Sequence, residues 1–228
     1  MSASDIAANW NEVRAAVPSG VEVIAVSKTK PIQAVEAAYA AGARSFGENR
    51  VQELVGKHEA LTHADSGRTD EFEGLQWHQI GTLQKNKVKY IAPFVDLIHA
   101  VDQAPLLDEI DKRAGAAGRR ISVLLQMHIA QESSKFGLSS QELEDILERI
   151  GDGAWSNVEV KGLMGMATFT DDTAQVAREF GGLRQLFESH GAERNWNTLS
   201  MGMSGDWRIA VDQGSTMVRI GSAIFGMR

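Results

Sequence analysis

The stretch VEVIAVSKTKPIQAVEAAYAAG, residues 21–42, contains the unit that decides the fold. Its β-branched run Val21–Ser27 predicts a buried strand. Pro31 is placed to open a helix and Gly42 to end it, so a helix is expected directly after the strand. Because the same order of strand and helix recurs along the chain, this stretch indicates an α/β fold.

Seven more strands are expected, with helical patterns between them: Arg44–Phe46, Leu75–Ile80, Val95–Ala100, Ile121–Met127, Val158–Met164, Leu199–Met201 and Met217–Ile220. Eight strand–helix units within about 200–250 residues are the signature of a (β/α)8 barrel. An open doubly wound sheet is the alternative, but no G-x-G-x-x-G motif follows Val21–Ser27. The sequence therefore predicts a TIM-type (β/α)8 barrel.

The remaining segments fit a single domain over residues 1–228. Apolar residues at helical spacing predict an amphipathic helix over residues 3–17, in a lead-in segment (1–17) before a barrel over residues 21–226. Ser139–Glu142 has the form of a capping box that starts a helix. The polar stretch Thr62–Gly74 is expected to be a surface loop.

Composition excludes several classes of function. The net charge of -7 lacks the basic field that binds nucleic acid or anionic membranes non-specifically. The chain has no Cys, which excludes disulfides, thiolate metal sites and a cysteine nucleophile. It begins with no basic and apolar leader, and it has no apolar run of about 18 residues. We expect a cytoplasmic protein with no nucleic-acid or membrane partner.

Several attractive motifs fail on spacing. His58 and His63 are five residues apart, whereas a zinc protease needs two histidines at i and i+4, so no metal ligand is assigned. The chain contains neither a P-loop nor a G-x-S-x-G nucleophile motif. Lys85, Lys87 and Lys89 are interpreted as a solvated helix face.

Lys28 closes the first predicted strand, on the same alternating face as Ile24 and Val26. Its amine is therefore expected at the C-terminal rim of the barrel, where catalytic groups of this fold lie. A lysine at such a rim can be desolvated and act as a Schiff-base nucleophile. The alternative is a lysine that extends to solvent from the end of a strand.

The last two predicted strands and the loops after them lie within residues 199–206 and 217–226. The loops after these two strands are where this fold recurrently binds phosphate. Gly221 lets the backbone approach an oxyanion, and Ser204 supplies a hydroxyl or, alternatively, caps the next helix. Arg219 is expected to face the barrel mouth, bound either to a ligand or to an acidic partner. Together with Lys28 these residues describe a pocket for a phosphorylated aldehyde, and pyridoxal 5'-phosphate (PLP) fits that description.

Five motifs, in order, resemble the pyridoxal phosphate homeostasis protein family: AVSKTK (25–30), FGENRVQE (46–53), WHQIGTLQKNK (77–87), MGMS (201–204) and GSTMVRIG (214–221). The resemblance extends from about Val23 to Gly226. It implies a single-domain barrel like the N-terminal domain of bacterial alanine racemase. It also implies that Lys28 carries PLP as an internal aldimine.

The cofactor-binding residues that the resemblance implies are Lys28, Asn49, Met203, Ser204, Arg219, Gly221 and Ser222. The two serines and Gly221 would hold the phosphate, Arg219 would face the pyridine nitrogen, and Asn49 with Met203 would line the ring pocket. Lys135 resembles a second family lysine near the cofactor entrance. The chain departs from the family pattern at Ser222, at His128 and over residues 165–169, where a Thr, an Asn and a Pro-containing run are usual.

An arginine at the pyridine nitrogen bears on the choice between carrier and enzyme. Arginine only donates hydrogen bonds, so it would keep the ring nitrogen unprotonated and weaken the ring as an electron sink. Alanine racemases also use a tyrosine from another domain and subunit, whereas this chain has only Tyr39 and Tyr90. We therefore expect a monomeric PLP carrier in cofactor homeostasis, with PLP-dependent apoenzymes as candidate recipients and no catalytic residue. The alternatives are a vestigial amino-acid racemase and a structural barrel without cofactor.

Overall fold

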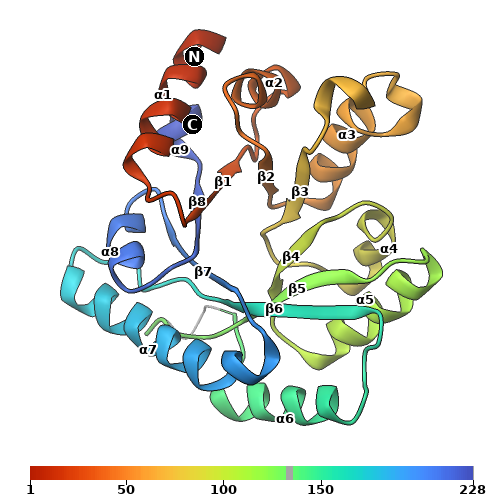
Figure 1. Ribbon diagram of the computed structural model, residues 1–228, viewed down its shortest axis with the longest axis vertical. Coiled ribbons are helices and arrows are strands. Elements are labelled where there is room, and N and C mark those ends of the chain that lie inside the picture. The colour runs from red at the N-terminus through yellow and green to blue at the C-terminus, as the bar shows by residue number, and fades with distance from the viewer. Residues whose placement is uncertain (132–135, 228) are drawn as a thin grey trace.

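Eight parallel strands close into a barrel in the computed structural model, which describes residues 1–131 and 136–227 (Figure 1). Each strand pairs with the next in sequence, and β8 pairs with β1 to complete the closure. The strands are β1 Glu22–Val26, β2 Ser45–Glu48, β3 Gln76–Gln79, β4 Leu97–Val101, β5 Ile121–Gln126, β6 Val158–Met164, β7 Thr198–Met203 and β8 Met217–Ile220. The predicted (β/α)8 barrel is confirmed.

The helices surround the barrel, and they are α1 Ala3–Ala16, α2 Ile32–Ala40, α3 Val51–Leu61, α4 Val88–Ile91, α5 Ala104–Ala116, α6 Ser140–Gly151, α7 Thr173–Gly191, α8 Trp207–Asp212 and α9 Ser222–Phe225. The predicted capping box is present at α6, where the Ser139 and Glu142 side chains each accept the other's backbone N–H. The lead-in helix α1 packs on α2 and α9, so the two chain ends lie side by side (Figure 1). No helix in the described ranges is both long and apolar enough to cross a membrane.

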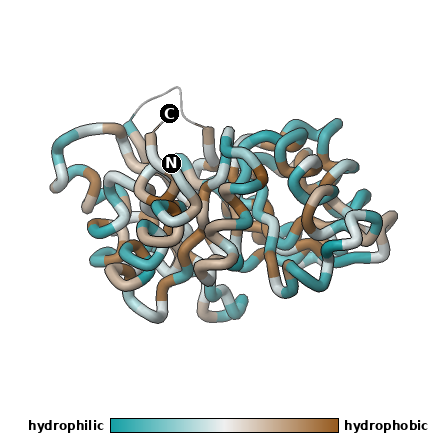
Figure 2. Tube along the Cα trace, turned by 90° about the horizontal axis from the view of Figure 1, so that it is seen from above, coloured by the Kyte–Doolittle hydropathy of each residue, from teal (hydrophilic) through white to brown (hydrophobic). Residues whose placement is uncertain are grey.

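Apolar side chains fill two regions, as expected for parallel strands that are covered on both faces. One lies between the strands and the surrounding helices, and the other fills the barrel interior with Ile24, Leu97, Leu124, Met164 and Met217 among its members. Hydrophilic segments lie mostly along the periphery of the molecule (Figure 2). The interior residues alternate with the outward-facing ones, which fixes the side chains that reach the rim.

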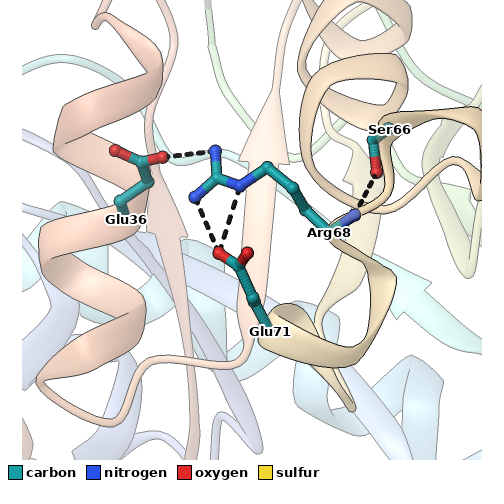
Figure 3. A network of polar contacts seen from close by, with 4 residues as sticks. All are labelled: Glu36, Ser66, Arg68 and Glu71. Atoms are coloured by element: carbon teal, nitrogen blue, oxygen red, sulfur yellow. Dashed lines mark hydrogen bonds and ion pairs between the residues drawn. The ribbon is translucent and has the colours of Figure 1, made fainter.

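The segment Thr62–Gly74, predicted as a surface loop, contains two short 3-10 turns, η1 Ala64–Ser66 and η2 Thr69–Phe72. Arg68 anchors it, because its guanidinium donates to Glu36 of α2 at 2.7 Å and to Glu71 at 3.0 Å (Figure 3). Phe72 is buried beside the Tyr39 ring, with 5.0 Å between the ring centroids. The segment is therefore packed against α2 through Arg68 and Phe72.

Candidate functional site

A cavity of about 460 Å³ opens at the C-terminal ends of the strands, the edge where binding and catalytic groups of this fold lie. Its volume is in the ordinary range for small-molecule sites, about 300–1,000 Å³. All seven predicted site residues line it: Lys28, Asn49, Met203, Ser204, Arg219, Gly221 and Ser222. The structure thus brings together residues from distant parts of the chain, while their individual roles stay predictions.

Lys28 follows β1 by two residues and is partly buried at the cavity wall. Val26, at the end of the same strand, also lines the cavity, and Ile24 points into the barrel interior. Ile24, Val26 and Lys28 therefore share one face of the chain, as the sequence predicts, and the last two of them line the cavity at the rim. The Lys28 side chain lies in the cavity lining, which disfavours a lysine that serves only to reach solvent.

Arg219 forms part of the cavity floor, with an exposed fraction of 4%. Its Nη1 donates to the carbonyl oxygen and the hydroxyl of Ser200, at 2.9 and 2.6 Å, and Nη2 donates to the Gly165 carbonyl at 3.1 Å. No described residue forms an ion pair with it, so the alternative of a structural salt bridge has no partner within residues 1–131 and 136–227. Burial lowers the pKa of Arg219 to about 10, which leaves the guanidinium charged at neutral pH.

Two buried histidines lie behind Arg219 and were not identified from the sequence. Because arginine only donates, the Ser200 hydroxyl accepts from Arg219 and is left to donate to His99 Nδ1, 3.3 Å away. His99 Nε2 lies 2.9 Å from His78 Nδ1. Burial lowers the pKa of His78 to about 3 and that of His99 well below its usual value. Both rings are therefore neutral, and they add no charge to the cavity floor.

The loops after β7 and β8 meet at Ser204, whose Oγ accepts the Gly221 backbone N–H at 3.2 Å. Asp206, not Ser204, occupies the N-cap of α8, so the alternative of Ser204 as a helix cap is wrong. Gly221 packs closely against the end of β1, because a Cβ at this position would lie 3.2 Å from the Val26 carbonyl oxygen. The two loops therefore bring a serine hydroxyl and a backbone without a side chain to the same end of the cavity.

Asn49 is fixed by the neighbouring β3 loop. The Gln79 side chain donates to the carbonyl oxygens of Asn49 and Gly81, both at 3.0 Å. A Cβ at Gly81 would lie 2.6 Å from the Asn49 carbonyl oxygen, so this close approach of two loops requires glycine. Further lining residues that sequence reasoning missed include Ile80, Thr82, Gln126 and Met166, whose only signal is a position at or just beyond a strand end.

The cavity carries positive charge although the whole chain is acidic. Lys28, Lys30 and Arg219 line it, and none of its described lining residues is Asp or Glu. The Lys30 ammonium donates to the carbonyl oxygens of Phe225 and Gly226, at 2.8 and 3.2 Å, which ties α9 to the rim. A concave site with one sign of charge attracts ligands of the opposite sign. The cavity therefore suits a small anion with an apolar body.

Other predicted candidates lie elsewhere. Lys135 is outside the described residues. His58 stacks on Phe94 at 3.7 Å, and the described residues contain no group of three His, Asp or Glu side chains placed to hold a metal. Neither Tyr39 nor Tyr90 lines the cavity. Among the described residues that line the cavity, none is a tyrosine that could lie opposite Lys28.

Comparison with known proteins gives one family. The chain matches the family described as alanine racemase, N-terminal domain, over residues 1–228. It is 37% identical over 214 residues to the pyridoxal phosphate homeostasis protein of Vibrio alginolyticus, covering 92% of this chain and 88% of that protein. The structure of PipY from Synechococcus elongatus PCC7942 with PLP bound has 34% sequence identity and a TM-score of 0.86, with 97% of this chain and 100% of that chain covered. Alanine racemase from Bartonella henselae, at 15% identity and a TM-score of 0.75, shares the fold over 100% of this chain and 60% of its own.

Proposed function

The chain belongs to the pyridoxal phosphate homeostasis protein family, and we propose that it binds PLP and takes part in PLP homeostasis without substantial catalytic turnover. One observation carries the proposal. A primary amine, a buried guanidinium and two serine hydroxyls line a single cavity that has no carboxylate among its described walls. These groups match the aldehyde, the pyridine nitrogen and the phosphate of PLP.

The loops after β7 and β8 are the proposed phosphate site. The hydroxyls of Ser204 and Ser222 supply neutral donors, and a phosphate forms strong, charge-assisted bonds with such groups. The Gly221 N–H donates to Ser204 Oγ and so orients that hydroxyl. The absence of a Cβ at Gly221 keeps this end of the cavity open. Asn49 and Met203 also line the cavity and are the proposed contacts of the ring.

Lys28 is the proposed attachment point, where its amine bonds to the aldehyde carbon with loss of water. When bound, PLP supplies an electron-withdrawing ring that can stabilise a carbanion. Arg219, held by Ser200 and Gly165, would donate to the ring nitrogen and leave it without a proton, which weakens that effect. These assignments favour holding the cofactor over transforming amino acids with it.

The proposal extends to partners. PLP-dependent apoenzymes are the proposed recipients, and the chain is proposed to act as a monomer of one domain. A racemase is the competing function, because the alanine racemases share the fold. That likeness concerns the fold alone.

The absorbance spectrum of the purified protein with PLP, recorded before and after borohydride reduction, tests the proposal. We expect a visible band that borohydride removes, with the pyridoxyl group then fixed on the chain. A protein with no such band would be the structural barrel. Chiral analysis of amino acids incubated with the loaded protein separates a carrier from a racemase.

A further inference from the structure

Ser27, the residue before Lys28, is fully buried and held by two side chains. Its hydroxyl donates to Glu48 Oε1 at 2.5 Å, and its carbonyl oxygen accepts from the Lys57 ammonium at 2.8 Å. Glu48 ends β2, and Lys57 lies on α3. Side chains from β2 and α3 therefore hold the residue that directly precedes Lys28.

Thr29, the residue after Lys28, is held from the same helix. Its backbone N–H donates to Glu53 Oε2 at 2.8 Å. Thr29 has a φ of 64°, a left-handed conformation that a β-branched residue rarely adopts without support. The hydrogen bond to Glu53 stabilises this left-handed conformation at the residue that directly follows Lys28.

The two carboxylate oxygens of Glu48 differ in their hydrogen bonds. Its Oε1 accepts from both Ser27 and Lys57 at 2.5 Å, whereas its fully buried Oε2 has no hydrogen-bond donor among the described residues. The Ser27 hydroxyl and the Lys57 ammonium therefore converge on one oxygen of this buried carboxyl group.

The two carboxyl groups differ in the direction of their pKa shifts. Burial raises the pKa of Glu48, although Lys57 and Ser27 oppose this shift. Partial burial would also raise the pKa of Glu53, but the Thr29 backbone N–H and Glu48 lower it overall. Through Ser27 and Thr29, the side chains of one strand–helix unit hold the residues on both sides of Lys28.

We propose that Glu48, Glu53 and Lys57 form a positioning unit that holds Lys28 in place for its bond to the cofactor aldehyde. This inference rests on the proposed function. None of the three residues lines the cavity, so each acts through Ser27 or Thr29 and not by contact with PLP. The competing interpretation is an ordinary buried ion pair between Glu48 and Lys57 that supports the fold.

A double-mutant cycle separates the two interpretations. We expect Glu53→Ala to raise the dissociation constant for PLP about tenfold, the effect of one lost hydrogen bond, when Lys28 is present. In the Lys28→Ala background the same substitution should change the constant by less than about twofold. Equal losses in both backgrounds would overturn the inference, because a general structural role acts with or without Lys28.

Substitution of Glu48 tests its contacts with Ser27 and Lys57. Glu48→Gln keeps a side-chain carbonyl oxygen that accepts from both residues, so borohydride-fixed attachment should be retained. Glu48→Leu removes both contacts and should lose attachment although Lys28 is still present. Full attachment in a folded Glu48→Leu protein would overturn the inference, because these contacts would then not position Lys28.

Glu36→Ala is the matched control, because Glu36 also accepts from a charged side chain, but its donor is Arg68 and not a neighbour of Lys28 (Figure 3). It should leave attachment unchanged. Melting temperatures of all variants identify any that fail to fold, and Glu53→Gln, which keeps an acceptor for Thr29, then replaces Glu53→Ala. If the unaltered protein fixes no pyridoxyl group on Lys28, the proposed function itself is wrong and the inference fails with it.

Discussion

At the scale of single residues, Lys28 is the first test of the proposed site. It lies in the same cavity wall as Ser204, Arg219 and Gly221, and it is the proposed attachment point. Lys28→Ala should abolish borohydride-fixed cofactor, because no amine remains at that position to bond the aldehyde. Peptide mapping after reduction measures the loss, and a circular dichroism spectrum like that of the unaltered protein shows that the fold is intact. A reduced pyridoxyl group found only on another lysine, such as Lys30, would contradict the assignment.

Arg219 leads to a second prediction at this scale. A charged guanidinium that only donates hydrogen bonds cannot protonate the pyridine nitrogen, and its pKa, lowered by burial to about 10, keeps it charged through neutral pH. We therefore expect racemization and transamination to be far slower than an ordinary enzyme rate of about 1 per second or more. Chiral chromatography and keto-acid assays of the loaded protein check this. Turnover at ordinary enzyme rates would mean that a different group sets the protonation of the ring.

At the scale of elements, the sequence predicts strands well and strand ends poorly. All eight predicted strands exist, because β-branched apolar runs at these lengths fit a strand covered on both faces. The strand predicted as Arg44–Phe46 is Ser45–Glu48, and the one predicted as Leu199–Met201 is Thr198–Met203. Both extensions depend on pairing with neighbouring strands, which local sequence does not encode.

The same limit applies to the site. The loop residues around Ser204 and Gly221 stood out because their residue types suit phosphate. The buried chain from Ser200 through His99 to His78 did not, because it forms only when the barrel closes and side chains of β4 and β7, which are not neighbouring strands, meet in its interior. A register shift between Ser200 and Met203 further decides which β7 side chains face inward. Such contacts are properties of the closed barrel and not of any one segment.

The loops after β7 and β8 give the prediction for this scale. Gly221→Asp should abolish PLP binding, because its carboxylate would face the phosphate dianion and its Cβ would crowd the Val26 carbonyl oxygen at 3.2 Å. Lys28→Ala, in contrast, should still bind PLP without a covalent bond, because the phosphate site supplies most of the affinity. Equilibrium dialysis of both variants compares them, with Gly182→Ala as a control at a glycine of α7 that lies outside the cavity lining and where a Cβ meets nothing within 4 Å. A Lys28→Ala protein that cannot bind PLP, beside a Gly221→Asp protein that binds normally, would reverse this ranking.

At the scale of the whole molecule, the barrel gathers positive charge at one edge of an acidic chain. The net charge is -7, yet Lys28, Lys30 and Arg219 line one cavity at the strand ends. None of the described residues that line this cavity is Asp or Glu. Behind Arg219, His78 and His99 are neutral, and protonation of either ring would place a second charge in the barrel interior. The interior that supports the site is therefore also the part of the molecule that is sensitive to acid.

His78 and His99 predict how the free energy of unfolding depends on pH. In the unfolded chain both titrate near pH 6.5, whereas burial lowers the pKa of His78 to about 3 and that of His99 well below its usual value. Below pH 6.5 the unfolded state therefore binds more protons than the folded state, so their contribution to stability is present above pH 6.5 and is lost as pH falls toward 3. Between pH 7 and pH 5, the titration of each histidine should lower the free energy of unfolding by about 2 kcal/mol. Urea unfolding at the two pH values measures this. His99→Gln should lose less stability over that interval than the unaltered protein, because one titrating group is gone. An equal loss in the His99→Gln protein would show that the buried pair does not control the acid sensitivity.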